Sequence, residues 1–181
     1  RDRADCPVGA FAVTGDLRAC AALIPSMRGC RSVIHTAALY SFSPRDRETI
    51  AAVNIRGTAG LLEAARIAGI ERGVVTSSSA ALAPSAASRP ATERDWATVD
   101  HSGSTYHASK LLSERAALIA RIPAITVLPT ASAGPGNHAP TPTGDTIVDL
   151  LPRPIAAPPG RRPDLRRVED GSPLPVRGRS E

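Results

Sequence analysis

Residues 47–77, RETIAAVNIRGTAGLLEAARIAGIERGVVTS, decide the fold class, because a long helical pattern leads directly into a short strand pattern. Apolar residues recur at helical spacing from Arg47 to Ala68, and Gly69 follows as a helix stop. Gly73–Ser77 is then a short apolar run that ends in hydroxyl side chains. Alternation of helices and strands of this kind predicts an α/β protein with a parallel sheet.

The same alternation extends on both sides of this stretch. Further strands are predicted at Gly9–Val13, Ser32–His35 and Ala124–Leu128. Further helices are predicted at Leu17–Met27, with Asp16 as the N-cap, and at Thr105–Ala120. We expect loops over residues 79–104 and 129–142, and a short helix that opens at Thr143. Helices should therefore cover both faces of the sheet, and ligands should bind beyond the carboxyl ends of the strands.

The composition argues against several classes of protein. The chain has 181 residues, of which 42% are hydrophobic and 22% charged, so a wholly disordered chain, collagen and a coiled coil are not expected. We also expect no membrane span and no signal peptide, because no apolar run is long enough for either. The three cysteines are too widely spaced for a zinc cluster and their odd number argues against a disulfide framework. They fit a reducing cytoplasm.

The basic excess lies mostly near the C-terminus. Lys and Arg total 22 against 17 Asp and Glu, a net charge of +5, and Lys110 is the only lysine. Residues 151–181 contain seven prolines and seven arginines without periodicity, so we predict a disordered tail after one domain over residues 1–150. Nucleic-acid binding is not expected, because the aromatic residues that usually accompany a basic stripe are only 3% of the chain.

The strongest chemical signal is the spacing of Tyr106 and Lys110, which places the two side chains on one helix face. A nearby ammonium lowers the pKa of a phenol, so such a pair can act as a general acid/base. The alternative is a solvated pair on a helix surface. Residues 74–79, which end in three serines, precede this helix, and a serine there could hydrogen-bond a substrate while Tyr106 moves the proton. The alternative is a strand end that satisfies its own backbone.

Together these segments resemble the extended short-chain dehydrogenase/reductase superfamily, which includes the NAD-dependent sugar epimerases and dehydratases. The matching segments, from about Ala10 to Asp149, are Gly15–Arg18, Val33–Ala38, Val53–Thr58, Val74–Ser79 and Tyr106–Lys110. Residues 134–135 and 140–144 are similar in particular to hopanoid-associated sugar epimerases and dihydroflavonol-reductase-like proteins. The resemblance implies a Rossmann-like, doubly wound parallel sheet. It is expected to be incomplete, because the chain contains neither the Gly-x-x-Gly-x-x-Gly turn of the family's first βαβ unit nor its C-terminal half.

The resemblance also implies a role for each matching residue. Tyr106 would be the catalytic acid/base, Lys110 would hold the nicotinamide ribose and tune Tyr106, and Ser78 would orient the substrate, with Ser79 as the alternative. Cofactor contacts are implied for Asp16 and Leu17 at the adenine, Thr36, Ala37 and Ala38 along the channel, Asn54 on the cofactor side, and Pro129 near the nicotinamide. No metal is implied. His35, at the end of an apolar strand, is expected to be structural rather than catalytic.

The implied function is that of an NAD(P)-dependent sugar-nucleotide epimerase/dehydratase-like oxidoreductase, with NAD or NADP as cofactor. The alternatives are an NADPH-dependent ketone reductase of the dihydroflavonol-reductase type, or an inactive product of a truncated or frameshifted gene. The implied partners are a small-molecule substrate, either a nucleotide sugar or a ketone, and a second copy of the chain. Dimerisation would use the two long helices, Arg47–Ala68 and Thr105–Ala120.

Overall fold

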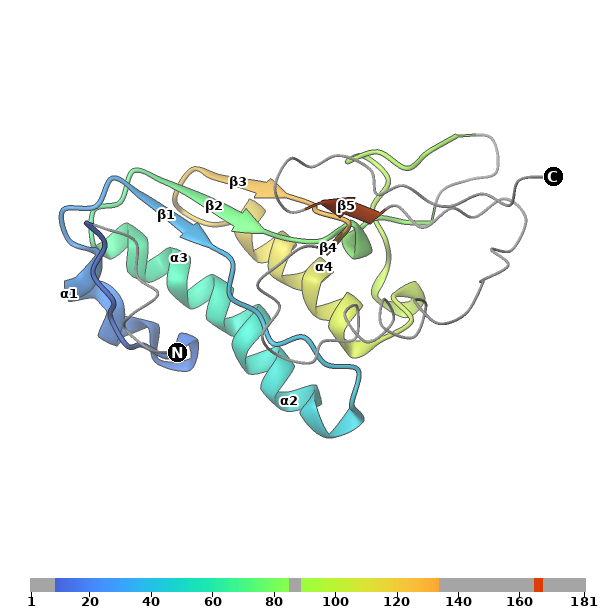
Figure 1. Cartoon of the computed structure of the whole chain (residues 1–181), viewed down its shortest axis with the longest axis horizontal. Helices are drawn as coiled ribbons and strands as arrows, with labels where there is room; N and C mark the ends of the chain where they lie inside the picture. The colour runs from blue at the N-terminus through green and yellow to red at the C-terminus, as the bar shows by residue number, and fades with distance from the viewer. Residues whose placement is uncertain (1–8, 85–88, 134–164, 168–181) are drawn as a thin grey trace.

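A three-stranded parallel sheet lies at the centre of the fold (Figure 1). The structure is a computed structural model, and it describes residues 9–84, 89–133 and 165–167. The strands, in their order across the sheet, are β1 (Ser32–His35), β2 (Arg72–Thr76) and β3 (Ala124–Val127). Ile34 pairs with Val74, which pairs with Ile125. The expected parallel sheet is confirmed, and its three strands lie where the sequence predicts them to within one residue at each end.

Two long helical stretches connect these strands. The first runs without a break through α2 (Arg47–Ile50), the π-helical turn η4 (Ala51–Arg56) and α3 (Gly57–Ile67). The second is α4 (Thr105–Leu118). The shorter helical segments are η2 (Leu17–Leu23), α1 (Ile24–Met27), η3 (Pro44–Asp46), η5 (Ser79–Ala81) and η6 (Val99–His101). Both predicted long helices are thus confirmed.

The main core lies between β2 and the two long helices. Buried Val75 of β2 packs with Leu62 and Ala65 of α3 and with Ala117 of α4. A second cluster joins η2 to α3 through Cys20 and Leu61. These contacts hold β2 against both helices, so the residues that follow β2 have a defined position relative to α4.

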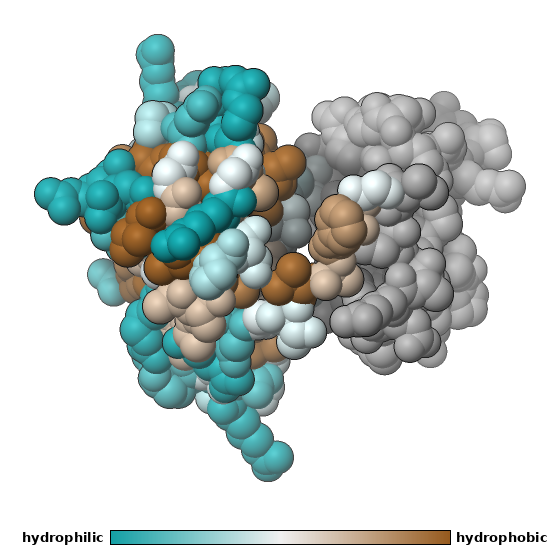
Figure 2. All heavy atoms as spheres, turned by 90° about the vertical axis from the view of Figure 1, so that its left-hand side faces the viewer, coloured by the Kyte–Doolittle hydropathy of each residue, from teal (hydrophilic) through white to brown (hydrophobic). Residues whose placement is uncertain are grey.

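Among the described residues, the helices pack on a single side of the sheet (Figure 1). Ile34 and Ile125, which face the other side, are 71% and 67% exposed. Helices on both faces were expected, but helical periodicity does not reveal which face of a sheet a helix will cover. Exposed hydrophobic residues also occur between hydrophilic ones on the side that holds α1, as Figure 2 shows.

The predicted strand at Gly9–Val13 is wrong. These residues form no strand, and Phe11 is 93% exposed. A strand requires a partner for its backbone groups, and β1 pairs only with β2 among the described residues. The helix at Leu17–Met27 is confirmed in extent, but Leu17–Leu23 is 3₁₀-helical with a kink at Ala19. The N-cap is confirmed, because Asp16 accepts a hydrogen bond from the Arg18 backbone at 2.8 Å.

Two short strands lie where none was predicted. β4 (Ala131–Ala133) falls in the expected loop, and it pairs in parallel with β5 (Leu165–Arg167), which falls in the tail expected to be disordered. Neither segment contains proline, so every backbone N–H is available for pairing. The helix expected at Thr143 and the rest of the tail lie outside the described residues. In the described part, no helix is long and apolar enough to cross a membrane.

Candidate active site

The helix that presents Tyr106 and Lys110 has a well-defined start. Ser104 is its N-cap and accepts a hydrogen bond from the backbone N–H of His107 at 3.1 Å. Gly103 precedes it with a φ of 70°, a conformation that glycine adopts without strain. This start places Tyr106 in the first turn of α4 and Lys110 in the second, on the same helix face.

Lys110 is tied to the end of β2. Its side chain is 5% exposed, and Nζ donates a hydrogen bond to the backbone oxygen of Thr76 at 2.7 Å. Burial lowers the pKa of Lys110, and the carboxylate of Glu114 acts in the opposite direction. The predicted catalytic lysine is therefore directed to the strand end at which the triple serine begins.

Tyr106 is half-buried in a cluster of aromatic side chains. Its ring lies 4.5 Å from that of Tyr40 and 6.0 Å from that of Phe42, between centroids. Burial raises the pKa of Tyr106, and Tyr40 adds to the effect. Desolvation thus opposes the phenolate in the free chain, and the ammonium is directed to Thr76. The expected tuning of Tyr106 by Lys110 stays a prediction.

The three serines after β2 have different surroundings. Ser77 is buried and donates its hydroxyl to Glu114. Ser78 is half-buried, and its hydroxyl oxygen accepts a hydrogen bond from the Ala80 backbone at 3.1 Å, which leaves the hydroxyl hydrogen able to donate. Ser79 donates its backbone N–H to Pro129 at 3.0 Å. The structure thus brings Ser78, Ser79 and Pro129 together beside the strand end that holds Lys110.

Asn54 connects the segment after β1 to α4. It accepts a hydrogen bond from the Leu39 backbone N–H at 2.8 Å and donates to the Leu39 oxygen at 3.0 Å. It also donates to the hydroxyl of Ser109 at 2.9 Å. The side chain is fully buried and lies in the π-helical turn, a distortion that is frequent at functional sites. In this structure Asn54 holds other parts of the site in place rather than presenting its amide to solvent.

The remaining predicted cofactor residues lie in two places. Thr36, Ala37 and Ala38 follow β1 and are exposed, so small side chains leave an open strip at the carboxyl end of the sheet. Asp16 and Leu17 lie at the start of η2, which packs on α3. The Arg18 guanidinium bonds the Asp16 carboxylate and lowers its pKa to about 2.

His35 is buried and has the expected structural character. Its Nε2 lies 2.9 Å from the hydroxyl of Thr58, and that hydroxyl donates to the backbone oxygen of Asn54 at 2.6 Å. The single hydroxyl hydrogen is thereby used, so Nε2 must donate. Burial, with a smaller contribution from Lys110, lowers the pKa of His35 to about 4. The imidazole is therefore neutral at physiological pH.

Sequence reasoning missed three residues of this site, namely Glu114, Tyr40 and Phe42. Glu114 follows Lys110 by the same four residues that separate Lys110 from Tyr106, and this spacing is a signal that could have identified it. Tyr40 and Phe42 lie in a loop, where sequence spacing does not predict contacts. Across the described residues, no group of three or more His, Cys, Asp or Glu side chains is placed to hold a metal ion.

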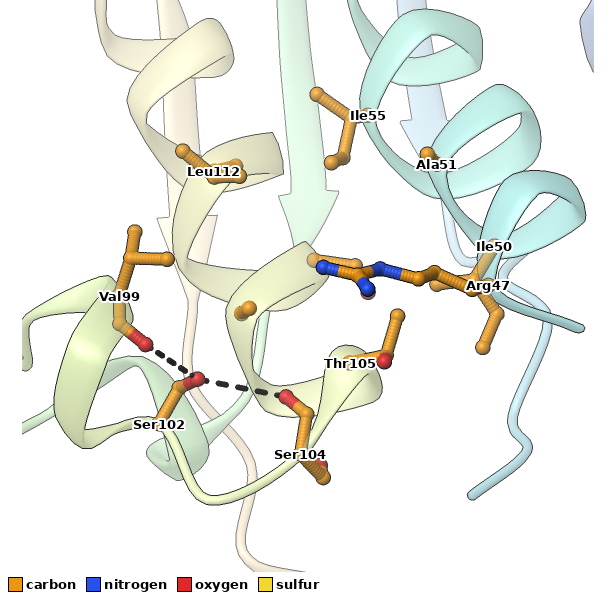
Figure 3. Close-up of a pocket in the computed structure, with 11 residues that line it drawn as sticks. Arg47, Ile50, Ala51, Ile55, Val99, Ser102, Ser104, Thr105 and Leu112 are labelled. Carbon is orange, nitrogen blue, oxygen red and sulfur yellow. Dashed lines mark hydrogen bonds between the residues drawn. The ribbon is translucent and has the colours of Figure 1, made fainter. Parts of the chain in front are cut away.

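A separate pocket of about 330 Å³ lies between α2–η4 and the start of α4 (Figure 3). Ile50, Ile55 and Leu112 contribute apolar side chains, and Arg47 extends across it. The strands lie behind the helices in this view. None of the predicted catalytic or cofactor residues lines this pocket.

Comparison with known proteins supports the resemblance. The NAD dependent epimerase/dehydratase family matches residues 2–159. A putative dihydroflavonol 4-reductase from Synechocystis is 37% identical over 148 residues, which cover 80% of this chain and 43% of that protein. The crystal structure of gox2253 is 34% identical, with a TM-score of 0.73, over 82% of this chain and 47% of that one.

A further solved structure contains ligands. MoeE5 in complex with UDP-glucuronic acid and NAD is 28% identical, with a TM-score of 0.59, over 68% of this chain and 42% of that one. The chain thus spans less than half the length of each of these three proteins.

Proposed function

The chain belongs to the NAD-dependent epimerase/dehydratase family, and from this membership we propose that it is an NAD(P)-dependent oxidoreductase acting on a sugar nucleotide. Ser78, Tyr106 and Lys110 would carry out the proton transfer that accompanies hydride transfer. The observation that carries this proposal is the bond from Lys110 to the end of β2, which brings the Tyr–Lys helix face to the strand that leads into Ser78. The UDP-glucuronic acid bound by MoeE5 supports a nucleotide sugar as the substrate class.

In this proposal each side chain has a distinct task. Ser78 donates its hydroxyl hydrogen to the substrate oxygen and so orients it. Tyr106 accepts the proton of a substrate hydroxyl in the oxidising direction and returns it to the carbonyl oxygen in the reducing direction. Lys110 supplies the positive charge that favours the phenolate while the proton is on the substrate.

The residues present fit a nicotinamide cofactor in part. Thr36, Ala37 and Ala38 would allow its close approach, with Lys110 and Pro129 on the nicotinamide side and Asp16 and Leu17 on the adenine side. The exposed strip after β1 supports this assignment. The carboxylate of Asp16 already accepts a hydrogen bond from Arg18. To contact the adenine, Asp16 would exchange this partner or bind through its backbone. When bound, the cofactor accepts or supplies the hydride.

A second candidate is the reduction of an apolar ketone, and the aromatic cluster favours it. Three of the five aromatic residues of the chain, Tyr40, Phe42 and Tyr106, lie in contact at the candidate site. Phe42 is 48% exposed, so it can form the wall of a binding site for a flat ring. The raised pKa of Tyr106 also suits proton donation to a carbonyl oxygen. The 37% identical relative is named a putative dihydroflavonol 4-reductase.

Turnover by the purified chain tests both candidates. For the first candidate we expect interconversion of a UDP-sugar without net change in the absorbance of the reduced cofactor, NADH. The second candidate predicts that NADPH is consumed when an aromatic ketone is added. Tyr106→Phe should lower kcat by about 10²–10⁴-fold. Tyr40→Phe, the matched substitution, keeps the ring packing and should lose far less. Full activity of Tyr106→Phe would contradict the proposal, and no turnover with either substrate would favour the inactive alternative.

We further propose a homodimer in the cytoplasm. The pocket between α2–η4 and α4 lies on the two long helices that the family resemblance assigns to dimerisation. The free thiols of Cys20 and Cys30 suit a reducing compartment.

A further inference from the structure

Two consecutive residues at the end of β2 are bound by two residues one turn apart on α4. Lys110 donates to the backbone oxygen of Thr76 at 2.7 Å, and Ser77 donates its hydroxyl to Glu114. We call these four residues the α4–β2 clamp. Because Lys110 and Glu114 share a helix face, the clamp fixes both the position of α4 along β2 and its rotation.

Glu114 joins three elements of the fold from a buried position. It is 1% exposed, and its other carboxylate oxygen accepts a hydrogen bond from the hydroxyl of Thr126 on β3 at 2.8 Å. Burial of a carboxylate costs free energy, and replacing a whole buried charged network by well-packed apolar side chains is often neutral or stabilising. Stability alone therefore does not explain a glutamate at this position.

We infer that Glu114 is a positioning residue, which holds the end of β2 against α4 and so holds Ser78 in place relative to Tyr106 and Lys110. Ser78 follows the clamp residue Ser77 directly, and Tyr106 precedes the clamp residue Lys110 by one turn. Loss of the Glu114 contact would remove one of the two side-chain contacts by which α4 holds the end of β2. This inference rests on the catalytic roles proposed above for Ser78, Tyr106 and Lys110.

The charges around Lys110 agree with this role. Lys110 interacts electrostatically with Glu114 on α4 and with His35 on β1, and Tyr106 precedes it by one turn of the same helix. His35 is neutral, since its pKa is about 4, and the Tyr106 phenol is protonated. Glu114 is therefore the carboxylate that offsets the burial of the ammonium.

The unique lysine allows a direct test on the full 181-residue chain. Labelling with ε-¹³C-lysine gives a single lysine signal, whose shift follows the titration of Lys110. In Glu114→Gln we expect the midpoint to fall by about one pH unit. Glu63→Gln, at an exposed glutamate of α3, should leave it unchanged. An unchanged midpoint in folded Glu114→Gln would overturn the inference.

A second pair of variants decides the question if Glu114→Gln does not fold. Ser77→Ala removes the clamp hydroxyl, whereas Ser113→Ala removes an equally buried hydroxyl that bonds only within α4, to the Lys110 oxygen at 2.9 Å. We expect the lysine signal to shift and broaden in Ser77→Ala and to remain as in the parent in Ser113→Ala. Equal signals in the two variants would overturn the inference. None of these measurements depends on turnover, so failure of the clamp can be told apart from failure of the proposed function.

Discussion

The phenol of Tyr106 can be titrated almost in isolation, because the chain contains only two tyrosines. Burial raises its pKa, so the free chain should form the Tyr106 phenolate only above the ordinary titration range of tyrosine. In Tyr40→Phe, the tyrosinate absorbance reports on Tyr106 alone, and we expect its midpoint to exceed that of a tyrosine model peptide. The Tyr106→Phe chain provides the spectrum of Tyr40. A midpoint below the peptide value would mean that the charge of Lys110 outweighs desolvation.

His35 should make stability depend on pH in a narrow range. Its pKa falls from 6.5 when unfolded to about 4 when folded, because of burial and then Lys110. Between these values the unfolded chain binds a proton that the folded chain does not. The contribution of His35 to the free energy of unfolding is therefore complete above pH 6.5. It is lost as the pH falls towards 4, and the total loss is about 3 kcal/mol.

Urea unfolding at a series of pH values measures this loss. We expect the free energy of unfolding of the parent to fall more steeply between pH 6.5 and 4 than that of His35→Gln, which cannot take up the proton. The carboxyl of Asp16, with a pKa of about 2, titrates below this range. Parallel curves for parent and variant would show that His35 is not responsible.

At the residue scale, spacing predicted which side chains share a face but not what they bond. The interval between Tyr106 and Lys110 placed both on one face of α4. It could not show that Nζ bonds to Thr76 or that burial raises the pKa of Tyr106, so the tuning of this phenol by Lys110 stays a prediction. Asn54 hydrogen-bonds to the backbone of Leu39, and no sequence pattern predicts this contact. The roles in catalysis and cofactor binding remain predictions.

At the scale of a single helix, Gly60 inside α3 and Gly69 just after its end have opposite requirements. Gly69 ends the helix with a φ of 83°, and nothing lies within 4 Å of an added Cβ. Gly60 is inside the helix, where an added Cβ would lie 3.4 Å from the Cys20 sulfur, an ordinary contact. Gly69→Ala should therefore destabilise the chain by about 1 kcal/mol through backbone strain alone. Gly60→Ala should stabilise it by about 0.5–1 kcal/mol.

Chemical denaturation of the two variants beside the parent measures both effects. The side chain added is the same, so a difference in sign isolates backbone conformation from side-chain size. Loss of stability in Gly60→Ala would show that the contact with Cys20 is too close, and an unaffected Gly69→Ala would show that the helix end adjusts.

A strand could be predicted from the sequence where its apolar pattern coincides with neighbouring strands that pair with it. β2 is apolar and lies between two strands, and its prediction is confirmed. Gly9–Val13 is equally apolar, but strand formation depends on a partner that a local pattern cannot reveal. The short strands β4 and β5 are the opposite example, because they pair with each other although neither has an alternating apolar sequence pattern.

At the scale of the whole molecule, two surfaces are candidates for self-association. One is the open sheet face, with Ile34, Ile125 and Val127 exposed. The other is the helix face around the pocket of Figure 3, where Leu112 and Ile55 line the cavity. The proposed dimer uses the helix face, and an interface that buries a charge without a partner is not stable.

Leu112→Arg and Ile125→Arg therefore separate the two surfaces. The two variants introduce the same positive charge, one on the helix face and one on the sheet face. Any general effect of an added arginine on solubility is therefore the same in both. We expect light scattering after size-exclusion chromatography to find a dimer for the parent and for Ile125→Arg, and a monomer for Leu112→Arg. A monomer only for Ile125→Arg would assign association to the sheet face, which would mean that the chain associates through the surface its own helices leave uncovered. A monomeric parent would contradict the dimer altogether, because the substitutions would then have nothing to disrupt.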